Sequence, residues 1–159
     1  MVGTPSKREI PSLPGARVLV VEARYHARIN DLLLQGARRV LDAAGVDSEL
    51  VRVPGALEIP PAIRLAADAG RFDAYLAIGC VIRGETLHFE LVAGESCRGL
   101  MDLGTRMALP IGNGILTVNT TQQAVIRAAP TGEDKGGQAA LAALTLLALA
   151  RRVAAEQVP

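Results

Sequence analysis

Short apolar runs alternate along the chain with longer stretches in which apolar residues recur at helical spacing. The apolar runs predict the four strands of a sheet. They are 17–23 (RVLVVEA), 48–53 (SELVRV), 73–82 (DAYLAIGCVI) and 111–118 (IGNGILTV). The helical stretches predict five helices, at 29–44, 59–69, 88–108, 120–128 and 137–155. In the third of these, Leu91, Val92, Leu100, Leu103 and Met107 are the expected apolar anchors.

Strands and helices that alternate at the spacing of βαβ units predict a parallel sheet with helices on both faces. A chain of 159 residues has the length of one domain. The predicted fold class is therefore α/β: a single-domain, three-layer α/β/α arrangement with a four-stranded, mainly parallel, flavodoxin-like sheet. Residues 1–15, which contain three prolines, predict an extended N-terminal arm, and residues 16–159 the α/β domain.

Composition excludes several classes of function. The net charge is +1 and basic residues form no block, so nucleic acid and anionic membranes are not expected partners. Cys80 and Cys97 belong to no CxxC or Cys/His cluster, which argues against structural zinc and against a disulfide scaffold. The N-terminus lacks the apolar core of a signal peptide, and the apolar run 139–150 is short for a membrane span. We therefore expect a soluble, cytoplasmic protein.

The chemically distinctive residues follow three of the predicted strands. These segments are 24–26 (RYH), 54–58 (PGALE) and 83–88 (RGETLH), and they include both histidines and one of the two tyrosines. Ligands of open parallel sheets bind beyond the carboxyl ends of the strands. The sequence thus predicts a binding site at that edge of the sheet.

The segment 84–88 allows two interpretations. Gly84, Glu85 and Thr86, just before a helix, could bind an anion through free backbone N–H groups, or Thr86 could simply cap that helix. His88 carries an imidazole, a side chain that suits proton transfer, although a lone histidine at a helix start is often only a surface residue. Neither histidine has the spacing of a metal ligand, and no phosphate-binding nucleotide motif occurs.

Three charged residues elsewhere are further candidates. Lys135 is one of only two lysines and stands between Asp134 and two glycines, so a functional cation and a solvated loop cation are equally good interpretations. By default, Arg127 is a favourable partner for the C-terminal dipole of its helix, and Glu58 is an exposed carboxylate in the first turn of its own helix, where the dipole favours it.

Four segments together carry a resemblance to a known family. They are VRVPGALEIPPA, AIGCVIRGETLHFE, GNGILTV and AVIRAAPTGEDKGGQAA, and the resemblance extends from about Arg17 to Arg152. In order and spacing they resemble lumazine synthase, the penultimate enzyme of riboflavin biosynthesis. The combination of PGxxEIP with GxxIRGxTxHF is specific.

The resemblance implies a cofactor-free and metal-free condensation of 5-amino-6-ribitylamino-2,4(1H,3H)-pyrimidinedione with 3,4-dihydroxy-2-butanone 4-phosphate, with release of phosphate and water. By resemblance, His88 is the general base and acid. Gly84, Glu85 and Thr86 hold the butanone phosphate, and Arg127 of a neighbouring subunit pairs with it. The residues implied at the pyrimidine and ribityl groups are Tyr25, Ala56, Leu57, Glu58, Cys80, Val81, Ile82, Asn113 and Lys135.

The chain departs from the commoner family pattern at a few positions. Tyr25 replaces a Phe or Trp and keeps an aromatic face, whereas Leu57 and Asn113 replace aromatic residues found in some relatives. His26 has no role carried over, and Gln138 stands where several relatives have a carboxylate.

Assembly is also implied by the resemblance. Members form pentamers with sites between adjacent subunits, and some pentamers build icosahedral shells. The loop APTGEDKGG lacks the Gly-Thr-Lys-x-Gly-Asn motif associated with shells, which favours a pentamer or a small stack of pentamers. Riboflavin synthase is a candidate partner.

Two other functions fit the same residues. The departures in the pocket could mark a protein that binds riboflavin or a related pteridine without turnover. Lys135 could form a Schiff base in an aldolase-like enzyme.

Overall fold

Four parallel strands form the centre of the molecule in the order β2-β1-β3-β4. The structure is a computed structural model that describes residues 9–157, so most of the predicted N-terminal arm lies outside the described residues. The strands are β1 (Arg17–Ala23), β2 (Asp47–Val53), β3 (Ala74–Ile82) and β4 (Ile111–Val118). Every neighbouring pair is parallel, so the sheet is wholly parallel where a mainly parallel one was predicted.

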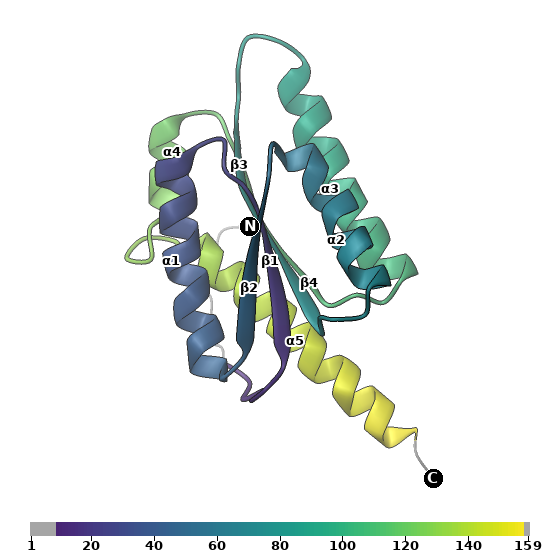
Figure 1. The fold of residues 1–159 in the computed structure, drawn as a ribbon. Helices are drawn as coiled ribbons and strands as arrows, with labels where there is room; N and C mark the ends of the chain where they lie inside the picture. Colours follow the sequence, from purple (N-terminus) through teal and green to yellow (C-terminus); the bar gives the residue numbers. More distant parts are fainter. Residues whose placement is uncertain (1–8, 158–159) are drawn as a thin grey trace.

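Within residues 9–157, five α-helices cover the two faces of this sheet (Figure 1). Helices α1 (Ala27–Ala44), α4 (Thr121–Ala128) and α5 (Lys135–Glu156) pack on one face. Helices α2 (Ile59–Asp68) and α3 (His88–Arg106) pack on the other, and a 3-10 turn, η1 (Ala56–Glu58), precedes α2. The predicted three-layer α/β fold is confirmed.

The burial of the strands explains their order in the sheet. Six of the seven residues of β1, and the first seven of β3, are buried, as expected of central strands covered on both faces. In β2, apolar and polar residues alternate only weakly. The strand is largely exposed because it lies at an edge of the sheet. The two faces of β1 enter two separate cores, with Val18 and Val20 toward α1 and Leu19 and Val21 toward α2.

Local signals fix the ends of the helices. Gly45 ends α1 with a positive φ of 74°, a conformation in which glycine has no steric cost. The side chains of Thr120 and Asp134 accept hydrogen bonds from backbone N–H groups at the starts of α4 and α5. Because Asp134 is the cap, α5 begins at Lys135, two residues before the predicted start.

Helix α5 crosses α1 at very short range. A Cβ atom placed on Gly136 would lie 1.9 Å from the backbone oxygen of Leu33, so only glycine fits there. Of the described helices, α5 alone is long and apolar enough to cross a membrane by length and composition, which the shorter apolar run had not indicated. Its buried residues, such as Ala140 and Leu144, pack into the α1-side core, whereas the greater part of the helix is not buried within this chain.

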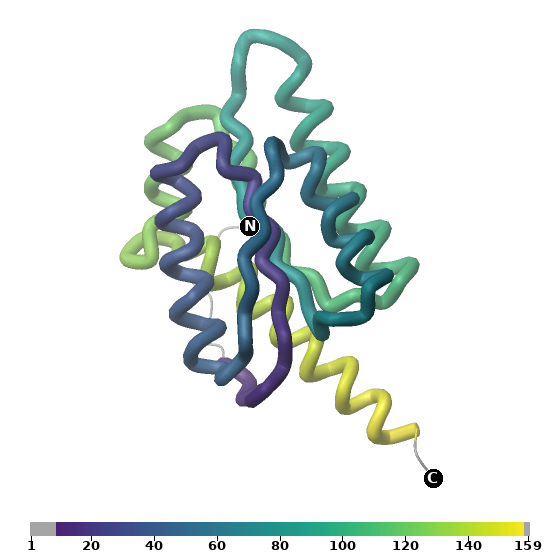
Figure 2. The backbone as a smooth tube through the Cα atoms, in the orientation of Figure 1, coloured from purple at the N-terminus to yellow at the C-terminus, as the bar shows by residue number. Residues whose placement is uncertain are grey.

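One predicted feature of α3 is wrong for the single chain. Leu100 and Leu103 are buried as expected, but Leu91 is 62% exposed and does not anchor the helix. Helical spacing identifies the apolar positions of a helix without showing which of them face the core of the same chain. Figure 2 shows that the loop from β3 into α3, just before Leu91, extends beyond the end of the sheet.

Candidate active site

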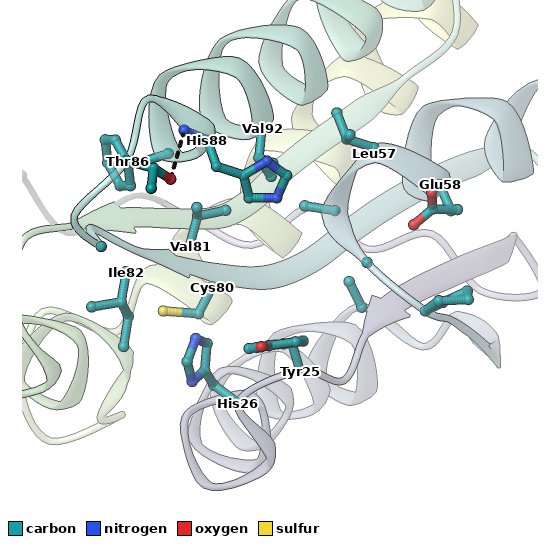
Figure 3. A pocket seen from close by; sticks show the side chains of 16 residues that line it. Tyr25, His26, Leu57, Glu58, Cys80, Val81, Ile82, Thr86, His88 and Val92 are labelled. Carbon is teal, nitrogen blue, oxygen red and sulfur yellow. Dashed lines mark hydrogen bonds between the residues drawn. The ribbon is translucent and has the colours of Figure 1, made fainter.

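A pocket of about 520 Å³ lies at the carboxyl ends of β1, β2 and β3 (Figure 3). In an open parallel sheet this is the edge at which ligands bind, and the chain here switches from one side of β1 to the other. The volume is that of a small-molecule site. The predicted site at this edge therefore coincides with a pocket.

Ten of the fourteen predicted site residues line this pocket. They are Tyr25, Ala56, Leu57, Glu58, Cys80, Val81, Ile82, Gly84, Thr86 and His88. Most of them come from the loop after β1, from η1, from the end of β3 and from the loop that leads from β3 into α3. Helix α3 begins with His88, and its first two turns add Phe89 and Val92 to the wall.

The loop from β3 into α3 brings an open backbone and an imidazole to the same side of the pocket. The N–H of His88 donates to the hydroxyl of Thr86 over 3.4 Å, although the formal cap residue is Leu87 and has no side-chain bond. No atom lies within 4 Å of a Cβ built on Gly84, so the backbone there is open to a ligand. This is both a helix start suited to an anion and a partial cap by Thr86, so the two interpretations are compatible.

Contacts of Arg83 fix this loop to its neighbours. Its guanidinium donates to Asn119 at 3.0 Å, forms an ion pair with Glu90 and lies 4.2 Å from the centre of the Phe89 ring. Its backbone N–H donates to Val118 O at 2.9 Å. The loop is thus joined to β4, and its cation already has a carboxylate partner.

The loop after β1 presents two rings. Tyr25 is 80% exposed, and its ring meets that of His26 edge to face, with 5.1 Å between centroids and an interplanar angle of 74°. Burial lowers the pKa of His26, so its imidazole is neutral at neutral pH. A planar ligand could cover the free face of Tyr25.

Glu58 brings a carboxylate to the pocket wall. It ends η1, and its side chain makes no capping bond to α2. A Cβ on Gly55 would lie 3.0 Å from its Oε2 atom, so the glycine makes room for this carboxylate. A carboxylate accepts hydrogen bonds only, which suits a ligand rich in hydroxyl groups.

Cys80 forms part of the apolar floor. Burial raises the pKa of its thiol to about 11, so the group stays protonated at neutral pH. The thiol is therefore a neutral contact rather than a nucleophile.

Two predicted residues near the α3 side lie outside the pocket. Glu85 is exposed beside Gly84, and since its carboxylate would repel a phosphate, its backbone N–H is the group that could bind one. Asn113 faces α3 from the middle of β4, where its amide contacts Cys97 Sγ at 3.8 Å and accepts from Ile115 N at 3.0 Å. Glu85 and Asn113 lie outside the pocket because the backbone at each position directs the side chain away from it.

Arg127 and Lys135 also lie outside the pocket, on α4 and at the start of α5. Arg127 Nη1 donates to the carbonyl of Gln123 at 3.3 Å, in the last turn of α4. Lys135 Nζ donates to Gln138 Oε1 at 3.2 Å and lies 3.5 Å from Glu133 Oε2. Within one chain, the structure does not bring these two cations to His88.

His26, Pro54 and Gly55 line the pocket without having been assigned a role. The signal for all three was present, since they stand in the segments directly after β1 and β2. Among residues 9–157, no three His, Cys, Asp or Glu side chains form a cluster suited to a metal ion.

The fold and the pocket define an α/β protein with a pocket of small-molecule size at the carboxyl edge of a parallel sheet. The model of the 6,7-dimethyl-8-ribityllumazine synthase family matches residues 15–151. The chain belongs to that family, as its motifs predicted.

Curated relatives agree with this assignment. A 6,7-dimethyl-8-ribityllumazine synthase of Sphingopyxis alaskensis is 62% identical over 134 residues, 84% of this chain and 94% of its own. One of Xanthobacter autotrophicus is 59% identical over 148 residues, 90% of each chain. One of Methylorubrum extorquens is 56% identical over 150 residues, 91% of this chain and 87% of its own. The predicted enzyme class is confirmed with the family.

Proposed function

We propose that the chain condenses 5-amino-6-ribitylamino-2,4(1H,3H)-pyrimidinedione with 3,4-dihydroxy-2-butanone 4-phosphate to 6,7-dimethyl-8-ribityllumazine. The observation that carries the proposal is the single pocket that gathers His88, Thr86, Glu58 and Tyr25 in a chain of this family. The reaction belongs to riboflavin biosynthesis, and we expect it in the cytoplasm.

The two ends of the pocket suit the two substrates. The exposed ring of Tyr25 offers a face to the pyrimidine, and Glu58 offers acceptors to the ribityl hydroxyls. At the other end, the backbone from Gly84 to Thr86 offers N–H groups to the phosphate. The substrates would then meet beside His88.

The chemistry requires orientation and proton transfer. The amine of the pyrimidine attacks the butanone carbonyl, and a first water leaves to give an imine. Elimination of phosphate then leaves an enol, which becomes a new carbonyl beside the imine carbon. The second nitrogen adds to this carbonyl and closes the ring with loss of a second water. No enzyme nucleophile is needed, which agrees with the protonated thiol of Cys80. His88 can take the proton from the attacking amine and deliver protons to leaving groups, a role in which an imidazole works well near neutral pH. Holding both substrates in one pocket supplies the remaining acceleration.

We further propose that a second copy of the chain completes the site. Phosphate departure requires fixed positive charge, yet Arg83 is paired with Glu90, and Arg127 and Lys135 lie outside the pocket of their own chain. Exposed apolar side chains at the start of α3 and along it, namely Leu87 at its cap and Leu91 and Met101 within it, provide surface for contact between copies. A pentamer, alone or in a small stack, is the expected assembly, and riboflavin synthase remains a candidate partner.

Incubating the purified chain with both substrates tests the proposal. A fluorescent lumazine should form, inorganic phosphate should appear in equal amount, and light scattering should give the mass of a pentamer or a multiple of it. A folded assembly that binds the lumazine product but releases no phosphate would instead identify a binding protein.

A further inference from the structure

A fully buried carboxylate lies next to the pocket and has no part in the reaction proposed above. Glu22 is the sixth residue of β1, and its side chain has no exposed surface. By the alternation of a strand it shares the α1-side face with Val18 and Val20, which are core residues. A buried charge is costly unless it is paired and hydrogen-bonded. Its partners therefore indicate why it is there.

Three side chains donate to this carboxylate. Oε1 accepts from Arg24 Nη1 at 2.7 Å and from Asn30 Nδ2 at 3.2 Å, and Oε2 accepts from Arg52 Nε at 3.0 Å. Burial alone would raise the pKa of Glu22, but the hydrogen bonds from Arg24, Arg52 and Asn30 outweigh it, and the pKa lies below its ordinary value. The group is thus a carboxylate at neutral pH.

Two of these partners hold the loop after β1. Arg24 directly precedes Tyr25, and its second amino group donates to Asp31 at 2.7 Å. Asn30 Nδ2 also donates to Ala23 O at 2.8 Å, and its backbone N–H donates to His26 O at 3.0 Å. Asn30 on α1 therefore fixes the backbone on both sides of Tyr25, and Glu22 holds the side chain of Arg24 next to it, while the exposed ring of Tyr25 meets that of His26.

The third partner joins the second loop of the pocket. Arg52 is opposite Glu22 in the register of β2 with β1. It stands two residues before Pro54, where the segment that carries Glu58 begins. The carboxylate of Glu22 thus connects two loops that line the same end of the pocket.

We propose that Glu22 is a positioning residue for the pyrimidine end of the site. It holds the Tyr25 loop and, through Arg52, the Glu58 loop at the separation at which both side chains contact one ligand. The inference rests on the proposed function for the identity of that ligand.

The other end of the pocket is held independently. Its loop is joined to β4 and α3 through Arg83, which contacts Asn119, Glu90 and Val118 and makes no bond to the Glu22 group. A disturbance at Glu22 should therefore weaken one substrate and spare the other. A general loss of stability would instead weaken the binding of both substrates alike.

Three variants test the proposal in the full-length assembly. Glu22→Gln removes the charge, and Arg52→Gln removes the connection to β2 with little risk to folding, because the Arg52 side chain is 61% exposed. Arg64→Gln is the matched control, since its side chain is about as exposed as that of Arg52 and its ion pair with Asp68 lies on α2, among residues that do not line the pocket. For each, KM for both substrates and kcat are measured, with the dissociation constant of the lumazine product from its fluorescence and the melting temperature.

In Arg52→Gln and Glu22→Gln, KM for the pyrimidine and the dissociation constant of the lumazine should rise about tenfold. The reason is that Tyr25 and Glu58 would no longer be held where both contact the ligand. KM for the butanone phosphate and kcat should stay within about twofold, and Arg64→Gln should resemble the native chain. Unchanged pyrimidine KM, or equal losses for both substrates in step with a lower melting temperature, would overturn the inference. A native chain that binds lumazine without turnover contradicts the proposed function alone, and the binding comparison then decides on Glu22. A native chain that does neither overturns both.

Discussion

The backbone N–H of His88 donates to the hydroxyl of Thr86 across 3.4 Å at the first turn of α3. The residue expected to move protons and a residue expected near the phosphate are therefore joined directly. Because the bond is long, the Thr86 hydroxyl remains able to turn toward a ligand. The relationship places proton transfer and phosphate binding within one helical turn.

Thr86→Ala should raise KM for the butanone phosphate about ten- to a hundredfold, the value of one lost hydrogen bond to a charged group. Thr86→Ser keeps the hydroxyl and should restore most of the affinity. Thr105→Ala, which removes a hydroxyl bonded to Met101 O further along α3, serves as control. Steady-state kinetics with each substrate varied in turn provide the measurement. An increase confined to the pyrimidine KM would show that Thr86 acts elsewhere.

His88→Ala should lower kcat by about 10²- to 10⁴-fold, the usual contribution of a general acid–base group. The affinity for the lumazine product should change little, since the apolar wall and Tyr25 remain. Rapid mixing of saturating substrates, followed by lumazine fluorescence, measures this. Turnover within a factor of two of the native chain would remove His88 from the mechanism.

Lys135 should form no covalent adduct. Its Nζ donates to Gln138 Oε1, lies 3.5 Å from Glu133 Oε2 and is outside the pocket of its own chain, so these contacts do not present it to a substrate carbonyl as a nucleophile. Treatment with butanone phosphate and borohydride, followed by mass spectrometry, should leave the chain mass unchanged. A reduced adduct at Lys135 would support the aldolase-like alternative.

The Glu22 group predicts a loss of stability in acid. The pKa of Glu22 is lowered in the folded state, so its contribution is complete above the unfolded pKa of about 4.5 and is lost as the pH falls through the lower folded value. Melting temperatures of the native chain should therefore fall below about pH 4.5 more steeply than those of Glu22→Gln, which starts lower at pH 7. Parallel curves for the two chains would show that another carboxylate is responsible.

The close crossing of α1 and α5 can be tested with two glycines. Gly136→Ala places a Cβ 1.9 Å from Leu33 O and should destabilise the fold by about 1–3 kcal/mol. Gly104→Ala on α3 has only Leu109 O at 3.8 Å and should stabilise it by up to about 1 kcal/mol through helix propensity. Chemical denaturation measures both, and equal effects would contradict the packing.

Much of this architecture could be predicted from the pattern of apolar residues. The runs of β1 and β3 are continuous because both faces are covered, and Gly45 marks the end of α1 as expected. The predicted starts of α1 and α5 are about two residues too late. At α5 the reason is the cap, because Asp134 caps the helix in an unusual backbone conformation, with φ at 50°.

The pocket was predictable as far as it follows the strand order. Segments after β1, β2 and β3 meet because parallel strands end at one edge. Periodicity gave no indication that Asn113 faces α3, or that Leu91 points away from the core, since both depend on what covers each face. The role of Glu22 was also hidden, because its partners Arg52 and Asn30 come together only in the folded chain.

The central claim is that His88 of one copy and Arg127 of another act on the same substrate. Co-expression of equal amounts of His88→Ala and Arg127→Ala chains tests it directly, because mixed assemblies would contain some sites with both native residues. If adjacent copies share each site, activity should return to roughly a quarter of the native level, although each variant alone is nearly inactive. Activity no greater than that of the two variants measured separately would contradict the shared site.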